Sequence, residues 1–496
     1  MALDNKQLPD ITSIAVPDYP RGELTCGIVH FGVGGFHRAH EAMYLDRLIS
    51  ADPGSRTWAI CGVGVLPSDA RMRDALVPQD GLYTLTLKHP DGTVETSVIG
   101  SIAQYLYAPD DPEAVIAKMA APETHIVSLT VTEGGYNFSP TTGAFDTSNP
   151  AVVADLEPDA VPATTFGLVT AALERRRAQG LPSFTVMSCD NIQGNGDIAR
   201  ATFTAFAELK DPELASWMSE NTCFPNSMVD RITPATAPEL LVEVEDRTGV
   251  ADRWPVVAEP FTQWVLEDSF SDGRPALETV GVQVVSDVGP YELMKLRLLN
   301  ASHQGLCYFG YLMGYRYVHD AAQDPLLRAL LRGYMNNEAR PTLLPAPGVD
   351  VEEYMETLIE RFSNPAIGDT IARLCQDSSD RIPKWLVPVI KSQLATGGDV
   401  ELAAAVVASW TRYAEGEDEN GDPIDVVDPL ADVLVPLAKK SRNDPLAFVG
   451  NTDLFGDLAE DDRFTRPYLS ALESLRGRGA RETLSRLTAA GQGTRE

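Results

Sequence analysis

The sequence predicts an α/β fold in which an N-terminal domain with a parallel sheet precedes a mainly α-helical C-terminal domain. Short apolar strand patterns alternate with helical patterns over most of the first 286 residues. The strand at residues 26–31 runs into a glycine-rich turn and then a helix, which is typical of nucleotide-binding folds. Strand patterns nearly stop after residue 286, whereas helical patterns continue. We therefore expect domains at residues 1–286 and 287–496.

The composition excludes several classes of protein. The 496 residues are enough for two or more domains with sizeable cores. With 40 basic and 71 acidic residues the formal charge is −31, which argues against a nucleic-acid or anionic-membrane partner. No stretch reaches 18 uninterrupted apolar residues, and the N-terminus lacks the features of a secretion signal. The six scattered cysteines form no CxxC pair, so we expect reduced thiols and a cytoplasmic location.

The first predicted strand, residues 26–31, leads into a glycine-rich turn and a helix at residues 41–49. Strand, glycine-rich turn and helix form the phosphate-binding unit of a Rossmann-like domain, in which backbone N–H groups approach a pyrophosphate. The motif is incomplete, because His37 stands where GxGxxG has its third glycine. The candidate cofactor-binding residues of this turn are Gly32, Gly34, Gly35 and Phe36.

A second predicted strand, residues 58–63, is followed by Ser68 and Asp69. An acid after the second strand is where the ribose 2′-hydroxyl of an adenosine is bound. Asp69 would repel a 2′-phosphate there, so we expect NAD rather than NADP. The alternative is that Ser68 or Asp69 caps the helix that follows.

Polar, glycine-rich segments follow two further strands of this domain. Glu133 comes after the strand at 125–131, and Asn191 after the strand at 183–188. Ligands of doubly wound folds bind at such strand ends. Asp230 lies in a short apolar strand, either as a ligand-contacting residue or as half of a local charge pair with Arg231. The other expected elements are a hairpin at 83–88 and 93–99, a loop at 137–163, a helix at 165–177 and strands at 263–267 and 280–285.

One long helix at residues 289–314 carries the densest group of polar residues in an apolar setting. Gly289-Pro290 is a helix start signal, and apolar residues at spacings of three, four and seven make the helix apolar nearly all round. This helix also contains Glu292, Lys295, Asn300 and His303, which lie within an arc of roughly 140° around the axis of a regular helix. Burial lowers the pKa of a lysine toward neutrality, which suits a general acid/base. In the alternative interpretation Lys295 reaches solvent, Asn300 satisfies a backbone group and His303 is a bonded core histidine.

The rest of the C-terminal domain reads as helices and loops. Arg373, Arg381 and Lys384 are cations within it, and most such cations are solvated. The acidic stretch at 415–425 is expected to be a solvated loop, and the tail from Gly491 to be disordered. The remaining helices are expected at 324–340, 351–362, 367–376, 382–394, 400–414, 428–441 and 466–488.

Five motifs together resemble those of the polyol-specific long-chain dehydrogenase/reductase family. They are GVGGFHRAH at 32–40, TEGGY at 132–136, DNIQGNG at 190–196, PNSMVDRITP at 225–234 and KLRLLNASH at 295–303. The resemblance implies a Rossmann-like domain, a helical C-terminal domain, a nicotinamide cofactor and no metal.

The resemblance also assigns roles to residues. It implies that Lys295 is the general acid/base, that Asn191 and Asn300 form an oxyanion hole, and that His303 orients the substrate. Glu292 is tied to the proton path from Lys295 to solvent. Asp230 and Arg373 match polar residues of the polyol pocket, and Arg381 stands where relatives often have lysine. Lys384, in the same segment as Arg381, is a further candidate for contact with the substrate.

The implied activity is NAD-dependent oxidation of a polyol to a ketose, such as D-mannitol to D-fructose, and the reverse. Alternatives are a D-arabinitol dehydrogenase, a fructuronate or tagaturonate reductase, and a non-catalytic NAD-binding sensor. A zinc dehydrogenase is disfavoured because the pair His37 and His40 has no cysteine nearby. Beyond the polyol or ketose we expect no macromolecular partner, and a monomer or weak homo-oligomer.

Overall fold

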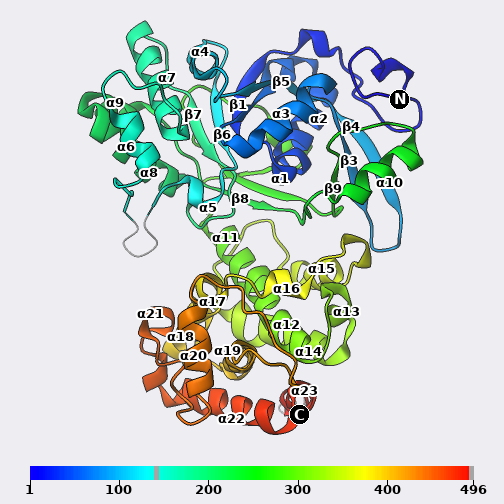
Figure 1. Cartoon of the computed structure of the whole chain (residues 1–496), viewed down its shortest axis with the longest axis vertical. Coiled ribbons are helices and arrows are strands. Elements are labelled where there is room, and N and C mark those ends of the chain that lie inside the picture. The colour runs from blue at the N-terminus through cyan, green and yellow to red at the C-terminus, as the bar shows by residue number, and fades with distance from the viewer. Residues whose placement is uncertain (139–143, 491–496) are drawn as a thin grey trace. The chain divides into compact units, whose positions relative to one another are not determined.

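The computed structural model describes residues 1–138 and 144–490 and divides into two compact units, Met1–Gly289 and Pro290–Glu496 (Figure 1). The sequence predicts the domain boundary at residue 286. The tail from Gly491, expected to be disordered, lies outside the described residues.

Unit 1, the N-terminal unit, is organised around a five-stranded parallel sheet with the strand order β5-β2-β1-β6-β7. This is the Rossmann-like order, with the chain turning to opposite sides of β1 in its two halves. The crevice for a nucleotide in such a sheet lies between the carboxyl ends of β1 and β6. The strands are β1 (Cys26–Phe31), β2 (Ala59–Gly64), β5 (Ile102–Tyr107), β6 (Ile126–Leu129) and β7 (Thr185–Ser188).

Each face of this sheet has its own hydrophobic core, because successive side chains of a strand point to opposite faces. From β1, Val29 and Phe31 enter a core shared with four helices on one face. Ile28 enters the other core, shared with α2 and the two small sheets. The four helices are α4 (Pro112–Ala120), α7 (Thr165–Gln179), α8 (Asn195–Lys210) and α9 (Pro212–Asn221), and α2 spans Glu41–Ala51.

Two three-stranded sheets complete unit 1. Their orders are β4-β3-β9 and β11-β10-β8. The strands are β3 (Tyr83–Lys88), β4 (Val94–Ile99), β8 (Ser227–Asp230), β9 (Val256–Ala258), β10 (Gln263–Glu267) and β11 (Gln283–Val285). The other helices of this unit are α1 (Gly35–Ala39), α3 (Ala70–Leu76), α5 (Thr132–Gly135), α6 (Pro150–Leu156) and α10 (Pro238–Thr248).

Several local expectations for unit 1 were wrong. The strands β5 and β9 were not predicted, and the segment expected as a loop at 137–163 contains α6, which starts at Pro150 behind the capping side chain of Asn149. The strand expected from residue 280 begins at Gln283, because a 3₁₀ turn occupies Leu277–Val280. A three-residue strand such as β9 is too short to show an alternation.

Unit 2, the C-terminal unit, consists of helices joined by loops, with two isolated β-bridges, Tyr317–Thr370 and Glu417–Pro423, among its described residues. Its helix α12 packs against α14, α16 and α19. Among the described residues, no helix of either unit is long and apolar enough to cross a membrane. The helices after α12 are α13 (Val318–Gln323), α14 (Pro325–Gly333), α15 (Val351–Phe362), α16 (Ile371–Leu374), α17 (Ser378–Trp385), α18 (Val387–Thr396), α19 (Glu401–Ala414), α20 (Ala431–Lys440), α21 (Thr452–Phe455), α22 (Asp462–Arg478) and α23 (Ala480–Ala490).

The helix expected to run without interruption over 289–314 contains a π-helical segment. It consists of α11 (Gly289–Lys295), the π segment η7 (Leu296–Asn300) and α12 (Ala301–Leu312). Ala301 N–H donates to the carbonyl of Leu296, five residues back. An i→i+5 turn changes which residues share a face, so the arc calculated for a regular helix does not apply across η7. Prediction from the spacing of apolar residues assumes a single helical period along the segment, so it cannot find a π-helical interruption.

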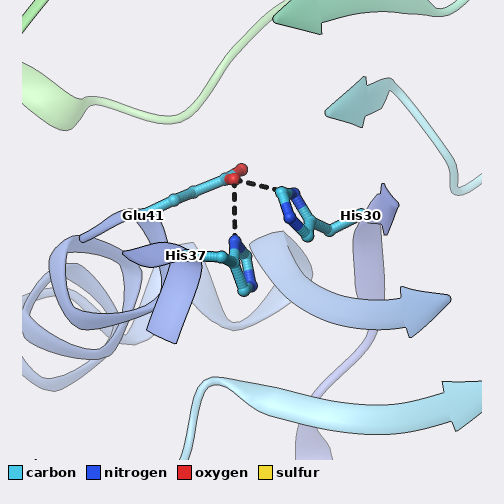
Figure 2. Close-up of side chains that lie close together, drawn as sticks. All are labelled: His30, His37 and Glu41. Atoms are coloured by element: carbon cyan, nitrogen blue, oxygen red, sulfur yellow. Dashed lines mark hydrogen bonds and ion pairs between the residues drawn. The ribbon is translucent and has the colours of Figure 1, made fainter. Parts of the chain in front are cut away.

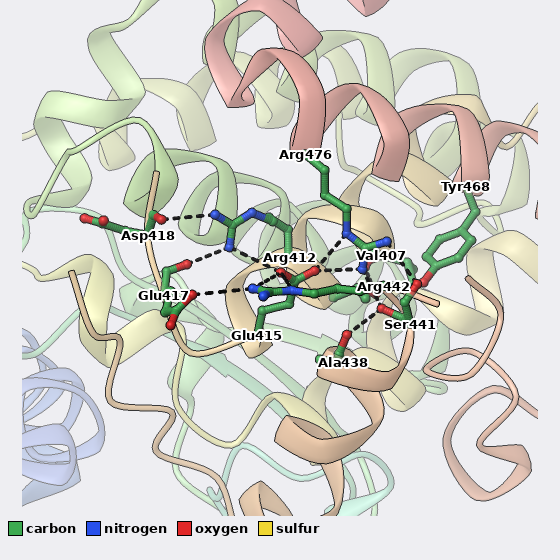
Figure 3. A network of polar contacts seen from close by, with 11 residues as sticks. Val407, Arg412, Glu415, Glu417, Asp418, Ala438, Ser441, Arg442, Tyr468 and Arg476 are labelled. Atoms are coloured by element: carbon green, nitrogen blue, oxygen red, sulfur yellow. Dashed lines mark hydrogen bonds and ion pairs between the residues drawn. The ribbon is translucent and has the colours of Figure 1, made fainter. Parts of the chain in front are cut away.

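A buried carboxylate joins three segments of unit 2 (Figure 3). Glu415, at the end of α19, is 1% exposed. It accepts hydrogen bonds from Arg442 and from Arg476, which lies on α22. Arg412 is 3.7 Å away. A charge buried to this extent is tolerated because several guanidinium groups satisfy its oxygens.

Candidate active site

The glycine-rich turn lies at the carboxyl end of β1, beside the end of β6. Gly32 has φ +92°, and a Cβ on it would lie 2.0 Å from the carbonyl oxygen of Thr130, so only glycine fits. The Gly32 carbonyl accepts hydrogen bonds from Gly34 N–H at 2.7 Å and from the Thr130 hydroxyl at 2.7 Å. Gly35 and Phe36 then begin α1. The backbone therefore has the close approach that a phosphate-binding turn requires.

Asp69 closes the turn after β2. Its Oδ2 accepts hydrogen bonds from the N–H groups of Val65 and Leu66, both at 2.9 Å. Asp69 makes no side-chain hydrogen bond to α3 itself, but the hydrogen bond that it accepts from Leu66 N–H caps the 3₁₀ turn Pro67–Asp69, which leads into α3. The capping role considered as an alternative is therefore confirmed in part. The same turn borders a cavity of about 560 Å³ whose other walls come from the segments after β5 and around Gly134 and Phe166. Asp69 thus shapes the edge of a cavity large enough for a nucleoside.

The ends of β6 and β7 are joined by a buried polar network next to Asn191. Asp190 accepts hydrogen bonds from the N–H groups of Val131 and Thr132 and from the hydroxyl of Tyr136. Asn191 itself is exposed, as is Glu133 on α5. Sequence reasoning assigned no role to Asp190 or Tyr136. An acid directly after a buried strand was the available signal for Asp190.

Asp230 is the last residue of β8 and is 6% exposed. The following Arg231 donates to the main-chain carbonyls of Glu259 and Ala39. Arg231 thereby fixes the end of α1 to the segment after β9. These hydrogen bonds give Arg231 an anchoring role, and the charge pair with Asp230 considered as an alternative stays a prediction.

Lys295, Asn300 and His303 lie on the interrupted helix of unit 2 and are 6%, 5% and 9% exposed. Lys295 ends α11, Asn300 ends η7, and His303 lies in the first turn of α12. Glu292 is half-buried, one turn before Lys295. Among the described residues, no hydrogen bond satisfies the buried Oδ1 of Asn300. The π segment lies between Lys295 and Asn300, and such segments are frequent at functional sites.

The three candidate cations of the substrate pocket are less buried. Arg373, at the end of α16, is exposed and forms a bidentate ion pair with Asp369, at 2.6 and 2.5 Å. Arg381 donates to the carbonyl of Leu374 at 3.1 Å. Lys384 is exposed and lies 2.6 Å from Asp380. An exposed ion pair constrains a cation only weakly, so these side chains can change partners at little cost.

A second polar group, not anticipated from the sequence, lies beneath the glycine-rich turn. His30, His37 and Glu41, here named the His–Glu cluster, bring three possible ligand atoms within 4.8 Å of one another (Figure 2). It is the one group of this kind found among the residues that the structure describes. The histidine within the apolar strand CGIVHF was the signal that sequence reasoning passed over. His40, considered with His37 as a zinc pair, instead contacts the carbonyl of Gln263 at 3.0 Å.

Comparison with known proteins decides the family. The mannitol dehydrogenase Rossmann domain model matches residues 26–279, and the mannitol dehydrogenase C-terminal domain model matches residues 287–476. The chain belongs to the mannitol dehydrogenase family. Mannitol 2-dehydrogenase of Phaeosphaeria nodorum is 48% identical over 98% of this chain and 85% of its own length. That of Aspergillus fumigatus is 47% identical over 98% of both chains.

Two solved proteins have similar structures over nearly the whole chain. One is mannitol 2-dehydrogenase of Pseudomonas fluorescens in a ternary complex with NAD and D-mannitol, with 44% identity and a TM-score of 0.87, covering 99% of this chain and all of that one. The other is a D-sorbitol dehydrogenase in substrate-free form, with 40% identity and a TM-score of 0.90, covering 98% of this chain and all of that one. The family membership and the Rossmann-like and helical architecture predicted from the five motifs are therefore confirmed.

Proposed function

We propose that the protein is an NAD-dependent mannitol 2-dehydrogenase that interconverts D-mannitol and D-fructose. The observation that carries the proposal is the 46–48% identity, over nearly the full chain, to curated mannitol 2-dehydrogenases from several fungi. The solved relative that binds both NAD and D-mannitol supports the same cofactor and substrate.

The residues of unit 1 fit a dinucleotide. Gly32 allows a phosphate to approach the backbone closely, and the cavity beside the Asp69 turn can accept the adenosine. We assign Gly32, Gly34, Gly35 and Phe36 to the pyrophosphate, Asp69 to the ribose and Glu133 to the rim of the site. When bound, NAD⁺ supplies the acceptor for the hydride that leaves the carbinol carbon.

Lys295 is the proposed general base. Oxidation of a secondary alcohol requires removal of the hydroxyl proton, and a buried ammonium group loses its own proton more readily than an exposed one. Asn191 and Asn300 would donate hydrogen bonds to the alcohol oxygen as negative charge develops on it. His303 would orient the same oxygen, and Glu292 would pass the proton from Lys295 toward solvent. The burial of Lys295, Asn300 and His303 on one helix supports these assignments.

The remaining hydroxyl groups of the polyol need polar partners. Asp230, Arg373, Arg381 and Lys384 are the proposed ones, since carboxylates accept and guanidinium groups donate hydrogen bonds to hydroxyls. The similarity to a D-sorbitol dehydrogenase favours D-sorbitol as a second candidate substrate, because the two polyols differ in the configuration of a single carbon. A uronate would need a cation for its carboxylate, and Arg381 is the residue to provide one.

The proposal is tested by initial rates of NAD⁺ reduction on D-mannitol, D-sorbitol and D-arabinitol, and of NADH oxidation on fructose and fructuronate. We expect the largest kcat/KM for D-mannitol and for fructose. A larger kcat/KM for D-sorbitol than for D-mannitol would make D-sorbitol the preferred substrate. Rates at the blank level for every substrate, with NADH binding intact, would favour the non-catalytic NAD-binding sensor.

We further propose that the enzyme works without a metal ion and as a monomer or weak homo-oligomer in a reducing compartment. All six cysteines are free thiols in the structure, which supports the compartment. Incubation with EDTA should leave the activity unchanged, and the mass measured by light scattering should be that of one chain at micromolar concentration.

A further inference from the structure

The His–Glu cluster is completely buried beneath the glycine-rich turn. His30 is 0% exposed, and His37 and Glu41 are 1% exposed. Glu41 Oε2 lies 3.0 Å from Nδ1 of His30 and 3.2 Å from Nδ1 of His37 (Figure 2). The two imidazole rings stack with their centroids 3.4 Å apart. Three ionisable groups in such a place are costly to fold unless their contacts repay the lost hydration.

The backbone explains how the three side chains meet. Alternation along β1 points His30 away from the core of Val29 and Phe31 and toward α1 and α2. The helix after the turn is broken at His40, where φ is −124° and ψ is −94°. Because of this break Glu41 starts α2 while its carboxylate contacts His37 on α1.

The hydrogen bonds around His30 connect it to the end of β6. Thr130 has one hydroxyl proton, and it is donated to the Gly32 carbonyl at 2.7 Å. The Thr130 hydroxyl oxygen can therefore only accept a hydrogen bond from Nε2 of His30, 2.9 Å away, so Nε2 carries a hydrogen. The other ring nitrogen, Nδ1, faces both Ser128 Oγ at 2.8 Å and Glu41.

The pKa values of the other two residues follow from their burial and their contacts within the cluster. Burial opposes ionisation of Glu41, but the contacts from His30 and His37 hold its pKa well below the usual range. Burial, together with the neighbouring His30, lowers the pKa of His37 to about 3, so His37 is neutral at pH 7. The ionised Glu41 carboxylate is thus stabilised in the buried site by its contacts with the two imidazole rings.

The cluster reaches the turn through Thr130. The Gly32 carbonyl accepts from the Thr130 hydroxyl as well as from Gly34 N–H, and Thr130 N–H donates to the carbonyl of Phe31. These bonds join the ends of β1 and β6, where the nucleotide crevice of the sheet lies. The direction of the Gly32 carbonyl fixes the peptide planes that follow, and hence where the N–H groups of the turn point.

We propose that the His–Glu cluster, acting through Thr130, is a positioning device that holds the glycine-rich turn in the conformation that binds the cofactor. The inference rests on the proposed function, because it takes the turn to be the pyrophosphate site. The cluster touches no substrate or cofactor. It sets the affinity for NAD(H) and leaves the chemical step to other residues.

The test compares four variants for NADH affinity and for kcat at saturating NAD⁺. Thr130→Val removes the hydroxyl and keeps the shape, whereas Thr130→Ser keeps the hydroxyl. Glu41→Gln removes the carboxylate charge that faces both histidines. Thr222→Val is the matched control, because Thr222 is also buried and its hydroxyl contacts Ser183 Oγ at 2.8 Å, at the amino end of β7 rather than at the turn.

We expect Thr130→Val and Glu41→Gln to raise the Kd for NADH about three- to tenfold, the effect of one lost buried hydrogen bond. Their kcat at saturating NAD⁺ should stay within about twofold of the wild type. Thr130→Ser and Thr222→Val should bind NADH like the wild type. If Thr130 and Glu41 only stabilised the fold, their variants would not lose NADH affinity while keeping kcat. Thr130→Ser would then not be expected to restore the affinity selectively.

Two results would overturn the inference. One is wild-type NADH affinity in both Thr130→Val and Glu41→Gln. The other is a stoichiometric metal ion in the purified protein that is lost in Glu41→Gln, since the same three atoms would then be metal ligands. A wild-type protein that fails to bind NADH at all would instead contradict the proposed function, so the two failures are distinguishable. If Thr130→Val does not fold, Glu41→Gln with Thr130→Ser decides the question.

Discussion

At the scale of single residues, the proposed chemistry depends most on Lys295. It is 6% exposed and ends α11, directly before the π segment. We expect Lys295→Ala to lower kcat at least about 100-fold at every pH from 6 to 10, because no other group is assigned to take the hydroxyl proton. NADH affinity should change little, since the turn that binds it belongs to unit 1.

The control for this variant is Lys391→Ala, which removes a half-exposed lysine of the same unit that lies 3.5 Å from Asp457. Its kcat should equal that of the wild type. Steady-state rates of both variants over the pH range check the prediction. Activity above about a tenth of the wild type in Lys295→Ala would remove this lysine from the role of base.

Asp69 has two separable tasks at the cofactor site. Its Oδ2 accepts hydrogen bonds from the N–H groups of Val65 and Leu66, which closes the turn. Its negative charge is proposed to exclude the 2′-phosphate of NADP. Asp69→Asn keeps an oxygen acceptor but removes the charge. We expect the ratio of kcat/KM for NAD to that for NADP to fall about tenfold, corresponding to about 1.4 kcal/mol of relieved repulsion.

Asp69→Ala tests the hydrogen bonds to the turn, because it removes both of them together with the charge. It should lower the melting temperature more than Asp69→Asn does and weaken binding of both cofactors. Steady-state kinetics with NAD and NADP, together with thermal melts of the two variants, provide the measurement. An unchanged cofactor ratio in Asp69→Asn would show that Asp69 only closes its turn.

Asp46 on α2 should make stability depend on pH. It is 9% exposed, and its Oδ1 accepts hydrogen bonds from the Tyr19 hydroxyl and Gly100 N–H. Burial raises its pKa to about 6 despite these bonds. Because the folded pKa lies above the unfolded one, the folded state binds the proton more tightly. The free energy of unfolding therefore falls as pH rises from about 4 to about 6, by up to about 3 kcal/mol.

Asp46→Asn removes this titration while its amide oxygen can accept the same two hydrogen bonds. We expect the variant to gain stability relative to the wild type as pH rises through this window, and the difference to level off above about pH 7. Denaturant unfolding of both proteins at pH 4.5, 6 and 8 measures it. A difference that stays constant with pH would mean that Asp46 is ionised throughout.

At the scale of elements, the π segment η7 is held by the neighbouring segment η8, Tyr334–Ala339. The Tyr334 hydroxyl donates to the Arg297 carbonyl at 3.1 Å, inside η7. We expect Tyr334→Phe to lower kcat about two- to tenfold, because Lys295 and Asn300 flank the segment that this bond supports. Tyr291→Phe is the matched control, since the buried Tyr291 hydroxyl instead contacts the Pro347 carbonyl.

The measurement is kcat for both variants alongside circular dichroism melts. Equal losses of kcat in the two variants would indicate general loosening of the helix, which is not the specific support proposed for η7. A loss confined to Tyr334→Phe would connect the π geometry to turnover.

The elements also show what pattern reading can and cannot find. The glycine-rich turn after β1 was predictable because strand, glycine and helix signals are local and follow one another in the chain. The π segment was not, since its residues are as apolar as those of a regular helix. The polar His30 was visible within its strand, but its partners Ser128 and Thr130 are distant in sequence and lie next to it only because β6 pairs with β1.

At the scale of the whole molecule, the residues proposed for cofactor binding belong to unit 1 and the proposed base belongs to unit 2. The same division appears in the two family models, which match residues 26–279 and 287–476. Variants of the cofactor turn should therefore act on NADH affinity, and variants of the interrupted helix on kcat. Thr130→Val should weaken NADH binding and keep kcat, whereas Lys295→Ala should lower kcat and keep NADH binding. The two variants together test whether unit 1 binds the cofactor and unit 2 supplies the base.

The net charge of −31 acts on both units and gives the last prediction. Excess negative charge repels itself more in the compact state than in the unfolded chain, so it destabilises folding at low ionic strength. Salt shortens the Debye length from about 30 Å at 0.01 M to about 10 Å at 0.1 M and weakens this repulsion. It also weakens exposed ion pairs such as Arg466–Asp462, but each such pair contributes little. We expect the melting temperature to rise by roughly 2–5 °C between 10 mM and 300 mM NaCl at pH 8. The rise should shrink at pH 5, where carboxylates begin to protonate and the net charge falls. Thermal melts at both pH values measure it, and a melting temperature that falls with salt at pH 8 would show that attractive ion pairs outweigh the net repulsion.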